Sequence, residues 1–464
     1  MLYSIPKLSD ALTLRVAEEA NGEAVHYALE RPGSEVSVKL APIAVAILML
    51  CDGRATIQNV YRRAKKLGLN PPSQFIEQLV KALYEVGFAS PAAVESLEHW
   101  LLPDPVQTCE GCGRSCEGHL IGPLAISEVN RIGALFDELV TLVPRLQGKA
   151  FVVRIPQYDG LYLNLQEGRC VFLEDDNLCA VHKHFGADAK PSICRTFPYQ
   201  RVYTETGVRL AVNNACFRYH GQGSRGRELP RLVKLTGSLA ELPTISGYAA
   251  PYDVMPLSGL PTELVAQRAR FLDTEERVIA YLSRDDASVS GLAKLVLGGD
   301  VSAPVAGFDV LPKGALLAAR DLVRRFSERA KLDAGFIGFI RETRCALGRS
   351  TKVLVTDLER LGADSSELDS PPCSPALEDV VLSHLRRLIW LRDVLQFETP
   401  QHAIAAHLVG WCVALWASGD LDGVGEHMAG WHRLLTEDDN HRHLFDSAAE
   451  ANSIIRLFLS ARQF

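Results

Sequence analysis

Cysteines gather in the middle of this chain. Seven of its eleven cysteines fall between residues 109 and 216, and a histidine follows the fifth of them by three residues. Thiolate and imidazole groups are the ligands that hold zinc ions and iron–sulfur clusters in proteins. The candidate ligands are Cys109, Cys112, Cys116, Cys170, Cys179, His182, Cys194 and Cys216. The sequence therefore predicts a metal-binding region between these limits.

The spacing of the donors leaves the identity of the metal open. Eight donors suit two tetrahedral zinc sites, one with four cysteines and one with three cysteines and a histidine. A 4Fe-4S cluster would take four cysteines and leave the others for a second site, redox work or structure. The first three cysteines, spaced C-x2-C-x3-C, match neither the paired C-x-x-C of a zinc ribbon nor the radical-SAM triplet. Disulfide pairing of six of the seven is the competing interpretation.

Composition favours an ordinary globular protein in a reducing compartment. The 464 residues carry 49 basic and 56 acidic side chains, a balance that argues against broad nucleic-acid binding. The N-terminus lacks the basic-then-apolar pattern of a secretory signal, and no run reaches 18 apolar residues. We expect a cytoplasmic protein with no membrane partner. In that setting clustered cysteines bind metal more often than they form disulfides.

Residues 1–95 should form a small domain of strands followed by helices. Alternating apolar residues predict strands over 12–16, 24–29 and 35–40, separated by turns at Asn21-Gly22 and Pro32-Gly33. Helical spacing predicts helices over 41–50, 56–67 and 73–86, with glycines at 53, 68 and 87 as stops. The pattern indicates a three-stranded meander packed against three helices.

This order of elements, with Leu50-Cys51-Asp52-Gly53 between the first two helices, resembles the PqqD-like peptide-recognition domain. The resemblance implies a winged-helix-like fold that recognises the leader of a ribosomally made peptide, as a RiPP recognition element does. The peptide would add as a strand beside residues 35–40 and helix 73–86. Backbone hydrogen bonds would supply affinity in such an arrangement, and shallow pockets would set the register.

A winged helix that reads DNA is the alternative for the same pattern. The second predicted helix carries Arg62, Arg63, Lys65 and Lys66. The third helix, which would have to enter the groove, offers Glu77 and Glu85, and acidic side chains there would repel phosphates. Peptide recognition is therefore the better interpretation, and nucleic acid is an improbable partner.

After residue 95 the predicted secondary structure is first a mixture of helix and strand and then mainly helix. Within 96–225, the metal-binding domain, spacing predicts a helix over 127–142 and strands over 151–155 and 161–165. A connection rich in Gly, Pro and Ser follows over 226–263. Helices are predicted over 264–283, 314–331, 377–394, 401–416 and 447–462, within a helical domain of residues 226–464. The expected fold class is α+β and predominantly helical.

A longer phrase surrounds the later cysteines. It reads Cys170-Val-Phe-Leu, then Cys179-Ala-Val-His182, then Lys190-Pro-Ser-Ile-Cys194-Arg195-Thr-Phe-Pro198. The phrase resembles the cysteine-cluster family of zinc- or iron-chelating proteins, and within it the flagellin lysine-N-methylase branch. In this chain Cys116 lies one residue further from Cys112 than a C-x-x-C-x-x-C pattern places it. The resemblance implies an iron–sulfur cluster and methyl transfer from S-adenosylmethionine to a protein lysine.

Together these features predict an iron–sulfur enzyme that modifies a peptide or protein, by lysine methylation or by other chemistry. Arg195 could hydrogen-bond cluster sulfurs or balance thiolate charge. No glycine-rich nucleotide loop is evident, and no catalytic residue can be assigned. Two alternatives remain: a zinc-stabilised scaffold that delivers a peptide to a partner enzyme, and a metal-responsive DNA-binding regulator.

Overall fold

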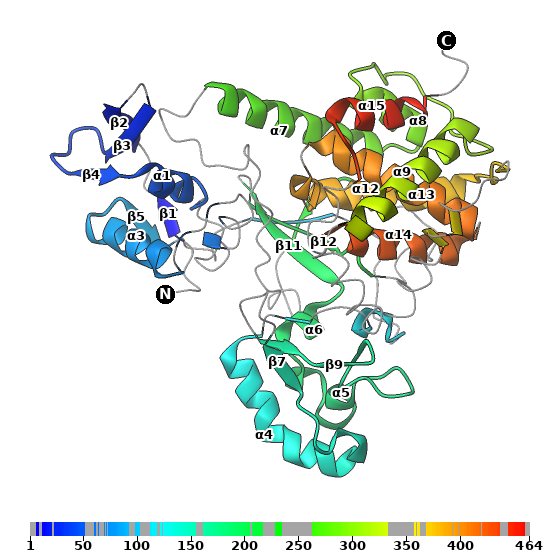
Figure 1. The fold of residues 1–464 in the computed structure, drawn as a ribbon, viewed down its shortest axis with the longest axis horizontal. Coiled ribbons are helices and arrows are strands. Elements are labelled where there is room, and N and C mark those ends of the chain that lie inside the picture. The colour runs from blue at the N-terminus through cyan, green and yellow to red at the C-terminus, as the bar shows by residue number, and fades with distance from the viewer. Residues whose placement is uncertain are drawn as a thin grey trace.

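The computed structural model describes most of the chain in separate stretches. These are residues 6–8, 12–20, 23–51, 60–61, 64, 69, 71, 73–91, 98–102, 112–117, 121–122, 124–154, 161–204, 207–216, 228–233, 262–332, 357–358, 360–361, 368–391, 393–397, 399–418, 420–436 and 444–459. Cys109, the Asn21-Gly22 turn, the basic residues 62, 63, 65 and 66, and most of the predicted helix 56–67 lie outside these residues. Figure 1 shows the N-terminal unit, the cysteine-bearing region and the helical body.

The N-terminal unit contains the predicted meander. Strands β2 (Thr13–Ala20), β3 (Glu23–Glu30) and β4 (Ser37–Leu40) pair antiparallel in the order β2-β3-β4. Helices α1 (Pro42–Leu48) and α3 (Ser73–Glu85) pack against them through Leu29, Leu48 and Leu83. Gly87, with φ of 71°, follows α3 in a conformation that side chains disfavour, so the predicted stop is confirmed. A short pair, β1 (Pro6–Leu8) with β5 (Ala89–Pro91), completes the unit.

The cysteine-bearing region has its own small core. Helix α4 (Ile126–Leu142) and the hairpin of β7 (Val152–Arg154) and β8 (Leu161–Leu163) lie where the sequence predicts them. A second hairpin, β9 (Leu165–Gln166) with β10 (Arg169–Cys170), leads into α5 (Ala180–Phe185) and α6 (Ser192–Thr196). Phe136, Phe151 and Phe172 stack in the core, with ring centroids 4.8–6.3 Å apart. This core holds the strand and the two helices that carry the later cysteines.

A four-stranded sheet joins this region to the helices. Its order is β11 (Tyr199–Thr204), β12 (Gly207–Val212), β6 (His99–Leu101) and β13 (Arg231–Leu232). Trp390 donates from Nε1 to the carbonyl oxygen of Leu210 at 3.0 Å, and the Arg209 guanidinium pairs with buried Glu275 at 2.8 Å. Ala211 and Val202 belong to the helical core. The sheet therefore packs with the helical body.

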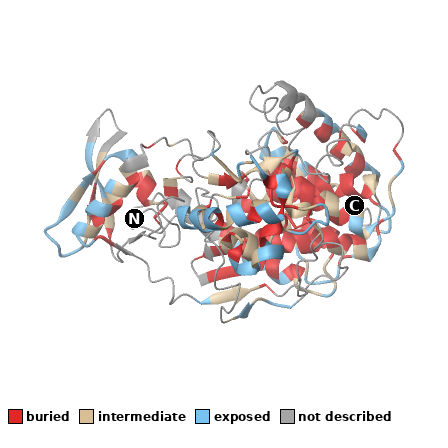
Figure 2. Ribbon diagram, turned by 90° about the horizontal axis from the view of Figure 1, so that it is seen from below, coloured by how far each residue is buried: buried red, intermediate tan, exposed pale blue. Residues whose placement is uncertain are grey.

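Helices make up the remaining body, and most buried residues lie there (Figure 2). They are α7 (Thr262–Leu282), α8 (Val289–Val296), α9 (Lys313–Leu332), α12 (Pro375–Trp390), α13 (Pro400–Ala417), α14 (Leu421–Thr436) and α15 (Ala448–Arg456). Helix α13 is central: residues 402–415 are all buried. Five of these helices were expected from the sequence, whereas α8 and α14 were not.

The architecture is α+β with helical bulk, as expected. The predicted domain limits at residues 95 and 225 stay predictions. The residues between 116 and 194 form one hydrophobic core, whereas the sheet strands β6, β11 and β12 contribute to the core of the helical body. Among the described residues, no helix combines the length and apolar character needed to cross a membrane.

Candidate functional site

The first cysteine loop lies beside the β10 strand. A short 3-10 helix, η2 (Arg114–Cys116), ends at Cys116, and the next residue, Glu117, forms an antiparallel bridge with Arg169. Arg169 directly precedes Cys170. Backbone pairing therefore brings Cys116 to Cys170 across more than fifty residues of sequence.

Gly113 fits this loop against the next turn. Its φ is 70°, and a Cβ at this position would lie 2.9 Å from the Cβ of Asn177. Asn177 itself has a positive φ of 63°, in the turn between Cys170 and Cys179. A residue larger than glycine would push the two cysteine loops apart.

Cys179 is placed by the chain folding back after Cys170. Leu173 bridges to Cys179, and the amide of Ala180 donates to the carbonyl of Phe172 at 2.8 Å. Cys179 is the N-cap residue of α5. The turn thus brings Cys179 back towards Cys170.

Cys194 lies on α6, whose start is held by α4. Glu128 accepts hydrogen bonds from the amide of Ser192 at 2.7 Å and from the amide of Ala125 at 3.0 Å. Burial would raise the pKa of Glu128, but the two backbone hydrogen bonds outweigh it and lower the pKa. One carboxylate therefore fixes the beginnings of both helices.

Four cysteines meet at this core. Cys170 is buried within it, and Cys116, Cys179 and Cys194 pack against it. Burial raises the pKa of the Cys170 and Cys194 thiols, and the neighbouring cysteines raise both further. Four thiols within electrostatic range of one another form a set that a bound cation would convert to thiolates.

Arg145 is a further residue of this site that sequence reasoning missed. Its guanidinium donates to the carbonyl oxygens of Val171, at 2.9 Å, and Leu173, at 3.0 Å. Its charge also lowers the pKa of Cys170, against the larger effect of burial. The arginine supports the loop that follows Cys170 and places positive charge beside a potential thiolate. No sequence motif marks it.

Among the described residues, Cys112, His182 and Cys216 are not part of this core. Cys112 is on the loop before η2 and is partly exposed, and Cys109 is outside the described residues. His182 is exposed on α5. Cys216 is buried in a separate small cluster with Val212, Phe197 and Tyr199. The disulfide interpretation finds no support at Cys112, Cys170, Cys179 and Cys194, which carry free thiols.

Arg195 was predicted to hydrogen-bond the cluster sulfurs or to balance thiolate charge. It lies on α6 next to Cys194. Its Nη1 atom donates to the carbonyl oxygen of Asp188 at 3.0 Å. That bond joins α6 to the preceding 3-10 turn of Ala187–Ala189. The role beside the cluster stays a prediction.

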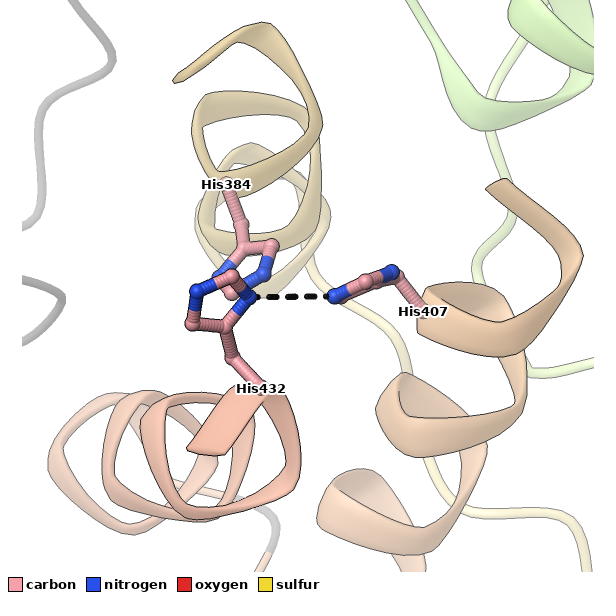
Figure 3. A group of neighbouring side chains, drawn as sticks. All are labelled: His384, His407 and His432. Carbon is pink, nitrogen blue, oxygen red and sulfur yellow. Dashed lines mark hydrogen bonds between the residues drawn. The ribbon is translucent and has the colours of Figure 1, made fainter. Parts of the chain in front are cut away.

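A second group of ligand-type residues lies in the helical body. His384 on α12, His407 on α13 and His432 on α14 are buried, and their donor atoms all lie within 4.8 Å of one another (Figure 3). The Nε2 atom of His407 is 3.4 Å from Nδ1 of His432. The rings of His384 and His407 have centroids 4.9 Å apart. Sequence analysis missed this group because its members share no local motif.

The tautomer of His407 is set by its helix. A carbonyl oxygen can only accept, so Nδ1 of His407 carries the hydrogen that bonds Ala403 at 2.7 Å. Nε2 therefore presents a lone pair towards His432 when the ring is neutral. Burial lowers the pKa of His407 to about 4, which keeps the ring neutral at physiological pH.

One loop connects the two groups of candidate ligands. Asn214, two residues before Cys216, donates to the carbonyl of His384 at 3.1 Å and accepts from Arg387 at 2.8 Å. Arg433 donates to the carbonyl oxygens of Ala215, at 2.8 Å, and of Glu117, at 3.5 Å. The segments that follow Cys116 and precede Cys216 thus both dock on the helices that carry the histidines.

Comparisons of this chain with protein-family models, with curated proteins and with solved structures found no match.

Proposed function

We propose that this protein is an iron–sulfur enzyme that modifies a peptide or protein substrate held by its N-terminal unit. The observation that carries the proposal is the gathering of Cys116, Cys170, Cys179 and Cys194 at one core. Four cysteine thiolates are the usual ligand set of a 4Fe-4S cluster. The residues present therefore fit that cofactor in number and in chemistry.

The four cysteines are less tightly grouped than the ligands of one zinc ion would be. Thiolates at roughly 2.3 Å from one zinc lie roughly 3.8 Å apart in a tetrahedron. Among the described residues, three donor atoms within 4.8 Å of one another occur at the histidine group and not among these cysteines. A four-iron cluster separates its cysteine ligands more widely, because each thiolate binds a different iron. Arg145 would offset part of the negative charge of such a site.

The N-terminal unit supports the choice of a peptide as substrate. Strand β4 is at the edge of its sheet and pairs only with β3 among the described strands. Val36, 43 % exposed, lies just before this strand, and Val86, 38 % exposed, follows α3, the helix that the resemblance places beside the bound peptide. An open edge with apolar positions beside it suits an extended peptide that adds as a further strand. Tethering the peptide would raise its effective concentration at the metal site.

The reaction to test first is transfer of a methyl group from S-adenosylmethionine to a lysine side chain. This choice rests on the resemblance of residues 109–216 to the flagellin lysine-N-methylases. When bound, the cluster would supply electron transfer or Lewis-acid chemistry. The chain's own part is to hold the four thiolates and to exclude water around them with Phe172 and its neighbours.

A peptide-display experiment tests the substrate class. The full chain would be used to select binders from a randomised peptide library, and the selected peptides would be titrated against three variants. We expect Val36→Asp and Val86→Asp to weaken binding by roughly tenfold or more, because a charge enters an apolar contact. Val16→Asp is the matched control: Val16 is also 43 % exposed but lies on β2, at the opposite edge of the sheet.

The selected peptides then serve as substrates. Lysine-containing binders incubated with the iron-loaded chain and S-adenosylmethionine should gain the mass of a methyl group. Failure to select any peptide, or equal binding by all three variants, would contradict the peptide-binding part of the proposal. Peptides that bind but gain no mass would direct the search to another modification.

A further inference from the structure

We propose that His384, His407 and His432 form a second metal site, which binds a zinc ion between helices α12, α13 and α14. The three donors come from three helices, and all three side chains are buried, at 0 %, 0 % and 5 % exposure. The site is separate from the four cysteines, so the inference stands whether or not those bind an iron–sulfur cluster.

The distance between two of the rings matches a metal site. Zinc–nitrogen bonds of about 2.0–2.1 Å place tetrahedral nitrogens about 3.4 Å apart. The Nε2 atom of His407 lies 3.4 Å from Nδ1 of His432. The same pair lies within hydrogen-bond distance, and a metal ion bound by both nitrogens would replace that contact. The third donor lies within 4.8 Å of both, so a small ring rotation of His384 would complete the set.

The Nδ1 atom of His407, the ring nitrogen that does not face His432, makes a hydrogen bond of the kind found at metal-binding histidines. A ligating histidine usually donates its other ring N–H to a carbonyl or carboxylate, which fixes the ring and its tautomer. His407 donates Nδ1–H to Ala403, one turn earlier on the same helix, at 2.7 Å. Its Nε2 atom points towards His432 (Figure 3). The ring is thus held in the orientation that binding requires.

The three imidazoles lie in surroundings that are largely apolar. His407 lies within a stretch of α13 that is buried on every side, and Phe397 packs its ring 5.7 Å from that of His407. Burying polar rings in an apolar core costs free energy that leucine would not. A metal ion bound to all three recovers this cost through its bonds to nitrogen.

The chemistry of the donors selects the metal. Three neutral imidazoles without a thiolate suit zinc, and other late first-row divalent ions less specifically. The ion would tie together three helices from separate parts of the sequence. With three protein ligands, the site would keep one coordination position that this chain does not fill.

Zinc content of matched variants tests the site. The full-length chain would be stripped with a chelator, reloaded with zinc alone and assayed for zinc per chain. His407→Gln and His432→Gln should each hold about one zinc fewer than the parent chain and lose the zinc-dependent rise in Tm. His402→Gln is the control, because His402 is buried on the same helix but bonds Thr399 and packs edge-on against Phe445.

A second measurement keeps the test decisive if a histidine variant does not fold. Replacement of Cys170 and Cys194 by serine removes the thiolate site and leaves the histidines intact. Loaded with cobalt in place of zinc, this variant should still bind about one ion and show no sulfur-to-cobalt charge-transfer band. The proposal is overturned if it binds no cobalt or zinc, or if the parent chain and both histidine variants hold equal zinc. Those outcomes would leave the iron–sulfur proposal unchanged, because it depends on the cysteines.

Discussion

Arg433 donates hydrogen bonds from Nε, at 3.1 Å, and from Nη2, at 2.8 Å, to the carbonyl oxygen of Ala215. Arg433 follows His432 on α14, and Ala215 precedes Cys216 at the end of the cysteine-bearing region. Both residues are buried. A single side chain therefore fastens the last segment of the cysteine-bearing region to the helix that carries one of the three histidines.

Replacing Arg433 with methionine should loosen that attachment. A buried hydrogen bond to a charged group contributes about 1.5–3 kcal/mol, so the free energy of unfolding should fall by roughly that amount. Amide hydrogen exchange at residues 213–216 should become faster. Arg277→Met is the control, because Arg277 is exposed and pairs only with Asp273, four residues earlier, at 3.6 Å in the described structure. Exposed pairs of this kind contribute at most about 1 kcal/mol. Unchanged exchange at 213–216 in the Arg433 variant would contradict the role given to it.

Arg145→Met should weaken metal retention at the cysteines. The substitution keeps an unbranched apolar stem but removes the donors to Val171 and Leu173, on either side of buried Phe172. We expect a loss of stability of roughly 1–3 kcal/mol and faster loss of bound iron to a chelator. The measurement is the rate at which visible absorbance decays under chelator. Arg154→Met, at an exposed position on β7, should behave as the parent chain does. Equal decay rates in the two variants would argue against support of the site by Arg145.

Gly410 should tolerate no side chain. A Cβ on Gly410 would overlap the ring of Trp431, which donates from Nε1 to Ala406 at 2.8 Å and precedes His432. Gly410→Ala should therefore push α13 and α14 apart, lower stability by roughly 1–3 kcal/mol and weaken zinc binding at the histidines. Gly314→Ala in α9 is the matched control, since its new Cβ would lie 3.6 Å from Leu457. Alanine favours helix over glycine by up to about 1 kcal/mol, so the control should be neutral or stabilised. A Gly410 variant as stable as the control would show that the helices can separate freely.

Asp393 should make stability depend on pH near neutrality. Burial raises the pKa of Asp393 to about 7, and a hydrogen bond with Gln200 only partly opposes this. Because the folded pKa lies above that of the unfolded chain, the folded state binds the extra proton. The free energy of unfolding should therefore fall as pH rises from about 4 to about 7. Asp393→Asn removes this dependence, so it should raise Tm relative to the parent chain more at pH 8 than at pH 5. A difference in Tm that is the same at both pH values would contradict the assignment.

The local elements of this fold could largely be predicted from the sequence. The meander, α4, the β7–β8 hairpin and five helices of the helical body follow from alternating or helical spacing of apolar residues. Helix α14 was missed because Gly423, Gly425 and Gly430 interrupt its pattern, and glycine lowers helix propensity. Burial of Met428 and Trp431 against α13 overrides that local preference.

Some of the candidate ligands could also be predicted from the sequence, and others could not. The cysteines could be found because they stand close together in sequence. Which of them meet is revealed only by the fold, through the backbone bridges of Glu117 and Leu173 and the packing of Cys194 against the same core. His182 was predicted as a ligand from its position three residues after Cys179; it is exposed on α5, and its role as a ligand stays a prediction. The three buried histidines are 23 and 25 positions apart on three helices. Spacing of this kind is set by helix packing, which a single sequence does not display.

Iron and sulfide analysis tests the central claim most directly. The chain would be reconstituted anaerobically with iron and sulfide, and iron, sulfide and the visible spectrum would be measured. We expect about four irons and four sulfides per chain in the parent. Cys170→Ser and Cys194→Ser should lose both. Cys373→Ser, which replaces a buried free thiol in the helical body, should retain them. A parent chain that takes up no iron, or serine variants at 170 and 194 that keep the full complement, would contradict the account.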